Sequence, residues 1–214
     1  MNENKLTFSA VWNKAATVLK GNWCIAILAV LIHMVITGSL GQFKPWGGII
    51  NLLITPLTSG LMLFFLKLSR NESRDLGSLF APFKDYPRML WGNLRMTIFI
   101  ILWSVLLIIP GIIAALRYSM TIYIMLDNPG LKAGEAMKQS CELVYGCKWK
   151  LFGYGILLSL LCITAGILTL GIALIWLVPF CNCFYANIYL ALKNERPTAP
   201  ANTVAAAEEN QTPA

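Results

Sequence analysis

Long apolar stretches dominate this chain and limit what it can fold into. Four of them approach the length that a helix needs to cross a bilayer: residues 23–40, 47–66, 151–168 and 171–192. A hydrocarbon core of ~30 Å takes roughly 17–25 residues. Only 13% of the residues are charged, about half the share in ordinary soluble domains. We therefore expect a multi-pass membrane protein rather than a soluble or a disordered chain.

A further apolar stretch, residues 96–126, is too long for one untilted span and contains Pro110-Gly111. This pair favours a break in a helix and leaves two structures open. Either one kinked helix crosses the membrane once, or two short helices form a hairpin that turns at the pair. In the hairpin, residues 96–109 give only about 21 Å of helix, so a re-entrant pair is a further alternative.

The distribution of basic residues favours the hairpin. With it, 15 Lys and Arg residues fall on one side of the membrane and only Lys44 on the other, with Arg117 inside a helix. A single crossing would divide the basic residues 9 to 8. Because basic residues concentrate in cytosolic loops, we predict about six spans in the cytoplasmic membrane, with both termini in the cytosol.

Three segments share one pattern: an amphipathic stretch, a glycine beside an aromatic or apolar residue, and a membrane hairpin. The amphipathic stretches predict helices, and a glycine follows each of them: 6–20 with Gly21, 76–90 with Gly92, and 131–145 with Gly146. Each such helix is expected to lie at the cytosolic interface, with its apolar side in the acyl boundary. The glycine then lets the chain turn into the bilayer.

The predicted fold class is all-α, a polytopic transmembrane helical bundle. Its about six spans form three helical hairpins, each preceded by an amphipathic cytosolic helix. Residues 1–193 form a single membrane domain with repeat units of approximately 5–66, 75–126 and 130–192. Residues 194–214, rich in Ala, Thr, Pro, Asn and Glu, are predicted to form a disordered cytosolic tail.

Polar side chains inside the predicted spans are the candidate binding residues: Arg117, His33, Asn182 and Asn187. A charge at the bilayer centre costs about 2.5–3.5 kcal/mol, so Arg117 should face the bundle interior, a water-filled cavity or a lipid phosphate. His33 is a candidate proton carrier, and the asparagines are candidates for a polar path. For His33 and the asparagines, a hydrogen bond that joins helices is the competing interpretation. For Arg117 it is snorkelling to the interface or binding to backbone carbonyls at a short helix.

The sequence lacks the patterns of an enzyme or a metal protein. No acidic residue lies in a predicted span, one histidine is present, and the six cysteines include no CxxC pair. We find no phosphate-binding or hydrolase motif and expect no catalysis, no cofactor and no metal. The net charge of +7 reflects cytosolic flanks. The expected partners are anionic membrane lipids and a membrane protein, not nucleic acid.

Several runs in the middle of the chain match a known family. They are Ile109-Pro110-Gly111-Ile112, Leu126-Asp127-Asn128-Pro129, Ala133-Gly134-Glu135-Ala136 and Gly146-Cys147-Lys148-Trp149. Through them the chain resembles an uncharacterised family of bacterial integral membrane proteins found mainly in Gram-positive species. It is more distantly similar to the membrane domain of some glycerophosphodiester phosphodiesterases. The resemblance covers most of residues 5–193, implies a polytopic protein of the cytoplasmic membrane and carries over no catalytic residue.

Two functions are open at this point. The leading hypothesis is a non-enzymatic accessory or scaffold protein that contacts anionic lipids or a membrane partner through its basic cytosolic helices. The alternative is a small transporter or lipid-handling protein with a polar path lined by Arg117, Asn182, Asn187 and His33. A sealed, packed surrounding of Arg117 would favour the first, and a cavity shared with the asparagines would favour the second.

Overall fold

The computed structural model describes residues 7–41, 47–106 and 108–195, and their regular structure is entirely helical. In chain order the elements are α1 (Phe8–Leu19), α2 (Trp23–Gly41), α3 (Gly47–Ser69), the short 3₁₀ helices η1 (Leu76–Leu79) and η2 (Ala81–Phe83), α4 (Tyr86–Leu106), α5 (Ile108–Tyr118), α6 (Thr121–Asp127), α7 (Ala133–Leu143), α8 (Lys148–Leu168) and α9 (Leu174–Glu195). The described residues contain no strand, which confirms the predicted all-α class. Most of the predicted tail, residues 196–214, lies outside the described residues.

The chain turns sharply between α1 and α2. The two helices meet at 94°, and Gly21 between them has φ +90°, a conformation that glycine adopts without steric strain. The side chain of Asn22 donates a 2.8 Å hydrogen bond to the carbonyl of Val18, which satisfies an acceptor at the end of α1. The predicted helix over 6–20 and the turn after it are thus confirmed.

The other two predicted amphipathic helices have different outcomes. The helix expected over 131–145 is α7, and Gly146 after it has φ +80°. The helix expected over 76–90 is wrong, because this stretch forms η1, η2 and the start of α4. Pro82 lies in the first turn of η2 and Pro87 in the first turn of α4, and each lacks the N–H that a continuous helix would need.

Gly92 also differs from its predicted role as a turn. It lies inside α4, which continues through it without a break. A Cβ at Gly92 would lie 2.6 Å from the sulfur of Met125, so the missing side chain lets α4 approach α6 closely. Gly60 in α3 is similar, because a Cβ there would overlap the backbone carbonyl of Leu79 in η1.

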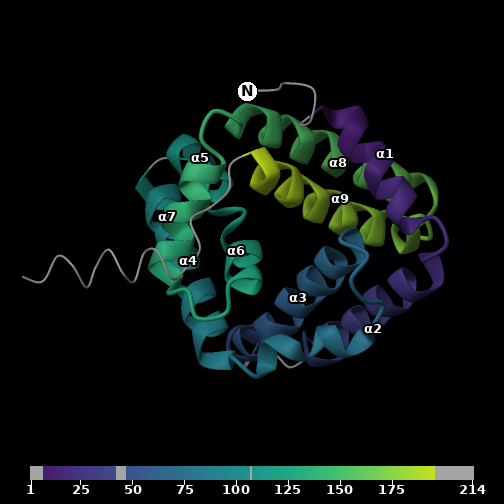
Figure 1. The fold of residues 1–214 in the computed structure, drawn as a ribbon, viewed down its shortest axis with the longest axis horizontal. Helices are drawn as coiled ribbons and strands as arrows, with labels where there is room; N and C mark the ends of the chain where they lie inside the picture. The colour runs from purple at the N-terminus through teal and green to yellow at the C-terminus, as the bar shows by residue number, and fades with distance from the viewer. Residues whose placement is uncertain (1–6, 42–46, 107, 196–214) are drawn as a thin grey trace, which may run out of the picture.

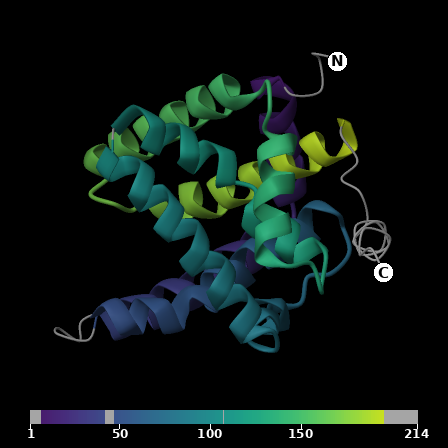
Figure 2. The ribbon, with the colours of Figure 1, turned by 90° about the vertical axis from the view of Figure 1, so that its left-hand side faces the viewer.

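Helices α4 and α5 form a hairpin, as the charge distribution predicts, and not one kinked helix (Figure 2). The turn predicted at Pro110-Gly111 is wrong, because α5 begins at Ile108 and contains both residues. Pro110 falls in the first turn of α5, where its missing N–H is tolerated. A Cβ on Gly111 would lie 2.7 Å from the Cα of Ser104, which shows how closely the helices pack. With 11 residues, α5 is about 16 Å long and too short to cross a ~30 Å core alone.

Fewer helices suit a membrane crossing than the predicted six. Helices α8 and α9 are long and apolar enough, and α1 with α2 pass the same test together, as a bent pair. The described residues therefore provide two candidate spans, or up to three. One reason is that part of the apolar stretch 96–126 is α6, whose residues Thr121–Met125 are buried inside the protein instead of facing lipid.

Helix α9 lies at the centre of the fold. It packs against α1, α2, α3 and α8, and Figure 1 shows α1 and α8 on one side of it and α2 and α3 on the other. Its side chains Phe184, Ile188 and Tyr189 are fully buried. Aromatic rings from α1, α8 and α9 itself pack together, with neighbouring centroids 4.4–6.5 Å apart: Phe8, Trp12, Tyr154, Phe180 and Phe184. In contrast, α8 leaves most of its apolar side chains exposed.

Candidate functional site

A buried carboxylate, Asp127, joins three helices at the end of α6. Its side chain is 7% exposed. The guanidinium of Arg70, just after α3, lies 2.6 Å from Oδ1. The hydroxyl of Tyr189 donates a 2.8 Å hydrogen bond to Oδ2, and the ammonium of Lys193 binds the same oxygen. Both carboxylate oxygens are therefore occupied by groups of the chain itself, and none is free to act on a ligand.

The surroundings of Asp127 keep it ionised. Burial alone would raise the pKa of this carboxyl group, but hydrogen bonds from Arg70, Lys193 and Tyr189 and the charge of Arg70 outweigh burial and lower the pKa to about 2. The hydrogen bond to Asp127 in turn raises the pKa of the Arg70 guanidinium above its ordinary value. At neutral pH Asp127 is therefore a carboxylate, and its contacts hold α6 to α9 and to the end of α3.

Arg88, in the first turn of α4, holds the chain that follows α6. Its guanidinium donates hydrogen bonds of 3.0, 3.1 and 3.2 Å to the carbonyls of Met125, Asn128 and Leu131. These acceptors belong to the last turn of α6 and the loop after it. Together with Asp127, Arg88 fixes residues 125–131. Sequence reasoning missed both clusters; an acidic residue directly after the apolar stretch 96–126 is the signal that would have pointed to one.

Two of the predicted site residues, Arg117 and Asn187, differ in their exposure to solvent. Arg117 is exposed in the last turn of α5, and its backbone carbonyl accepts a 2.7 Å hydrogen bond from Ser140. Asn187 is 1% exposed in α9, and its Nδ2 donates to the hydroxyl of Ser69 at 3.2 Å and the carbonyl of Cys183 at 2.9 Å. The first is a surface charge, and the second joins α9 to α3.

The other two predicted site residues, His33 and Asn182, each have a hydrogen-bond partner within the protein. His33, half-buried in α2, has its Nε2 3.3 Å from the hydroxyl of Thr58 in α3. Asn182 donates a 2.9 Å hydrogen bond to the carbonyl of Val178 in its own helix. None of the four residues lines either of the two cavity systems described below, and they do not share a partner. The structure therefore does not gather them into one polar path.

A hydroxyl-lined cavity of about 320 Å³ lies among α2, α3, α4 and the end of α5. Its polar lining is uncharged and consists of Thr37, Thr55, Thr58, Ser59, Asn93, Tyr118 and Ser119. His33 reaches its edge through Thr58. Neutral hydroxyl and amide groups can bind water or a small neutral polar molecule, whereas an ion would find no opposite charge in this lining.

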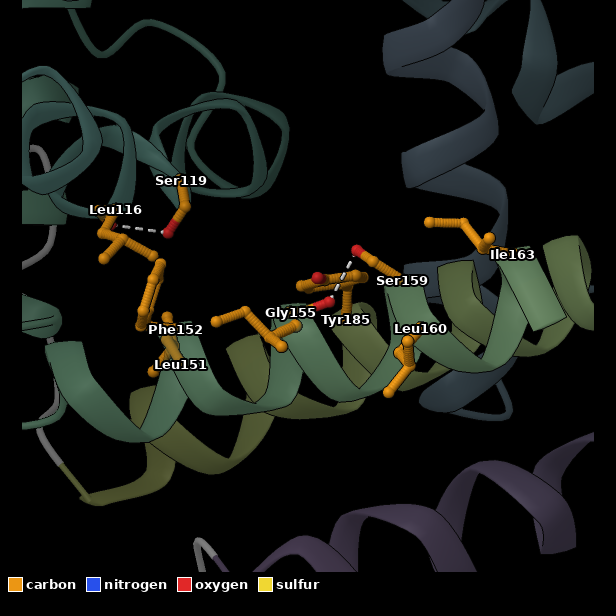
Figure 3. A pocket seen from close by; sticks show the side chains of 10 residues that line it. Leu116, Ser119, Leu151, Phe152, Gly155, Ser159, Leu160, Ile163 and Tyr185 are labelled. Atoms are coloured by element: carbon orange, nitrogen blue, oxygen red, sulfur yellow. Dashed lines mark hydrogen bonds between the residues drawn. The ribbon is translucent and has the colours of Figure 1, made fainter. Parts of the chain in front are cut away.

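A second hollow is the α5–α8 groove, formed by two adjoining cavities of about 480 and 470 Å³ that share Leu116 and Phe152. Figure 3 shows its longer part, with Leu116 above α8, a row of α8 side chains, and Tyr185 behind them. The remaining lining is mainly apolar: Ile112, Ile113, Lys148, Trp149, Leu151, Gly155, Ile156, Ser159, Leu160, Ile163 and Ser119. The groove can take an extended apolar molecule.

Basic and aromatic residues mark one end of the α5–α8 groove. Lys148 lines it there, and its ammonium lies 5.5 Å from the centre of the Tyr145 ring. Trp149 beside it is 78% exposed. Among the described residues, no group of His, Cys, Asp and Glu has an arrangement suited to a metal ion. The groove is therefore a candidate binding site that relies on apolar contact and one positive charge.

Comparison with known proteins gives one match. Residues 92–196 match the model of a protein family of unknown function, DUF975. The matched region runs from α4 to the end of α9 and includes Arg88's acceptor loop, Asp127 and the α5–α8 groove. No curated protein and no solved structure matches the chain. The match supports the resemblance to an uncharacterised family; similarity to the phosphodiesterase membrane domain and a Gram-positive distribution stay predictions.

Proposed function

We propose that this is a multi-pass protein of the cytoplasmic membrane that acts without catalysis, as an accessory or scaffold protein that binds anionic lipids or a membrane partner. The observation that carries the proposal is the surface of α8. Ile156, Leu160 and Ile163 are 51–59% exposed along it, while Lys148 and Lys150 stand in its first turn. An exposed apolar helix that begins with basic residues suits a bilayer with an anionic headgroup layer.

The lipid preference can be measured on the purified full chain. Thermal unfolding in detergent, followed by tryptophan fluorescence, is compared after adding phosphatidylglycerol or phosphatidylcholine with the same acyl chains. Because a ligand that binds the folded state raises its stability, phosphatidylglycerol should raise Tm more. Equal Tm values with both lipids would contradict binding to anionic lipid.

The proposed topology places both termini and residues 127–150 in the cytosol. Helices α8 and α9 cross as a hairpin, and the short α4–α5 hairpin returns the chain to the side from which it entered. The basic residues in this segment support that orientation. Lys138, exposed on α7, is replaced by cysteine in a chain without its native cysteines. A membrane-impermeant maleimide should label it only after permeabilisation. Labelling in intact cells would place this segment outside the cell and contradict the proposed topology.

A small transporter is the second candidate function, because the cavity of about 320 Å³ has a neutral hydroxyl lining. The path proposed from the sequence, through Arg117 and the asparagines, is replaced here by a path past Thr58 and Asn93. Vesicles containing the protein are mixed with glycerol, and light scattering follows their recovery of volume. Faster recovery than in empty vesicles, slowed by Thr58→Val, would support transport of neutral solutes. Equal rates would exclude it for this solute.

A further inference from the structure

We propose that the α5–α8 groove binds one anionic phospholipid, with an acyl chain against α8 and the phosphate at Lys148. This inference rests on the proposed function and gives it a defined site. It follows from three properties of the groove: its length, its mainly apolar lining, and the position of its charge.

The groove has the dimensions of an acyl chain in one leaflet. From Lys148 to Ile163 the helix rises about 22 Å, which exceeds half of a ~30 Å hydrocarbon core. Gly155 lies midway along the lining and leaves the floor without a side chain there. Figure 3 shows this open stretch between Phe152 at one end and Ile163 at the other.

The lining offers no unpaired hydroxyl from its serines. Ser119 donates to the carbonyl of Leu116 at 2.8 Å, and Ser159 donates to the carbonyl of Gly155 at 2.7 Å. Both bonds stay within the protein, so apart from the Tyr185 hydroxyl near Gly155 the groove presents a mainly apolar surface to its occupant. An acyl chain enters the groove from lipid or detergent that is equally apolar, so packing against the groove holds the chain in place while the headgroup charge decides between lipids.

The charge at one end selects the headgroup. Lys148 is half-buried in the groove, and no ion pair joins it to an acidic residue of the described chain. Trp149 and Tyr145, 78% and 69% exposed, flank it with rings of the kind that favour the headgroup region. A second copy of the chain suits the site less well, because two copies with the same orientation in a bilayer would pair α8 helices in parallel and place both Lys148 side chains at the same depth.

Native mass spectrometry of the full chain in detergent tests the proposal. Phosphatidylglycerol and phosphatidylcholine with the same acyl chains are titrated separately, and the lipids retained per protein are counted. We expect one retained phosphatidylglycerol. Lys148→Gln should weaken its binding about fivefold, the equivalent of the ~1 kcal/mol that one lysine contributes near an anionic lipid. Ile156→Trp should abolish retention by filling the groove.

Matched variants separate this site from general effects. Lys84→Gln removes an equal charge from an exposed position outside the groove lining. Ile167→Trp adds an equal ring at a position that is 72% exposed and outside the groove lining. Both should bind phosphatidylglycerol like the unaltered chain. Circular dichroism and Tm verify that all four variants are folded.

The outcomes distinguish the site from the broader function. If phosphatidylglycerol is preferred but Lys148→Gln and Ile156→Trp bind it normally, the groove assignment is overturned and lipid binding elsewhere stands. If the chain shows no preference between the two lipids, both proposals fail. A dimer that Ile156→Trp converts to a monomer, without retained lipid, would identify a second copy as the occupant and would also overturn the assignment.

Discussion

Replacing Asp127 by asparagine should destabilise the fold by about 2 kcal/mol. The pKa of this carboxyl group falls from 3.8 to about 2 in the folded chain. At about 1.36 kcal/mol per pKa unit, that difference corresponds to roughly 2 kcal/mol in favour of the charged form. Breaking a fully buried ion pair costs about 3–5 kcal/mol. The value here is smaller because the side chains of Arg70 and Lys193 are 24% and 32% exposed and recover some hydration.

Equilibrium unfolding of the full chain by sodium dodecyl sulfate in mixed micelles measures this loss, with tryptophan fluorescence as the signal. Asp85→Asn is the matched control, because its carboxylate is 58% exposed and lies 3.8 Å from Arg88. An exposed pair of this kind contributes at most about 1 kcal/mol. Equal unfolding midpoints for Asp127→Asn and the unaltered chain would refute the conclusion that this cluster stabilises the fold.

The same cluster makes stability depend on pH in a definite direction. Because the folded-state pKa of Asp127 lies below its unfolded value, its contribution is fully present above the unfolded value, about pH 4. It is lost as the pH falls toward about 2. Asp127→Asn should remove this part of the acid dependence and leave the remainder. Parallel acid profiles for the variant and the unaltered chain would contradict the assignment.

Two further predictions address packing between helices. Gly60→Ala should destabilise the fold by about 1–3 kcal/mol, since its Cβ would overlap the carbonyl of Leu79, whereas Gly38→Ala meets no atom within 4 Å and should have little effect on the same unfolding curve. Cys162 and Cys181 have sulfurs 3.7 Å apart between α8 and α9, so copper phenanthroline should oxidise them to a disulfide and lower the count of maleimide-reactive thiols by two. An unchanged thiol count would show that this helix pair is arranged differently.

The sequence predicts local elements of this fold better than its long-range contacts. Amphipathic periodicity predicts α1 and α7, and charge counting predicts the hairpin of α4 and α5, although Pro110 lies inside α5 and not at the turn. The prediction of one helix over 76–90 is wrong because it gave the amphipathic periodicity more weight than Pro82 and Pro87. The described residues provide fewer candidate spans than the predicted six, because an apolar side chain fits a protein interior as well as lipid. Ile122 and Ile124 in α6 face the interior.

The sequence did not predict the charge cluster around Asp127, for a different reason. Asp127 is 57 positions from Arg70 and 66 from Lys193 along the chain, so no local spacing brings the three together. The residues chosen from the sequence, Arg117 among them, are polar groups within apolar stretches. That criterion finds polar side chains that are unusual in their surroundings. It does not find those that pair with one another across helices, because pairing depends on the packed arrangement of α3, α6 and α9.

The clusters and the α5–α8 groove are parts of one arrangement. Asp127 and Arg88 fix the end of α6 and the loop that leads to α7. From α7, Ser140 donates to the carbonyl of Arg117 at 2.7 Å and accepts a 3.3 Å hydrogen bond from the N–H of Met120, so it holds the junction of α5 and α6. Leu116, one residue before Arg117, forms the wall of the groove opposite α8. The position of that wall therefore depends on contacts of α6 and α7. Charged groups that pair within the chain, away from the groove, thus shape a binding surface that is itself mainly apolar.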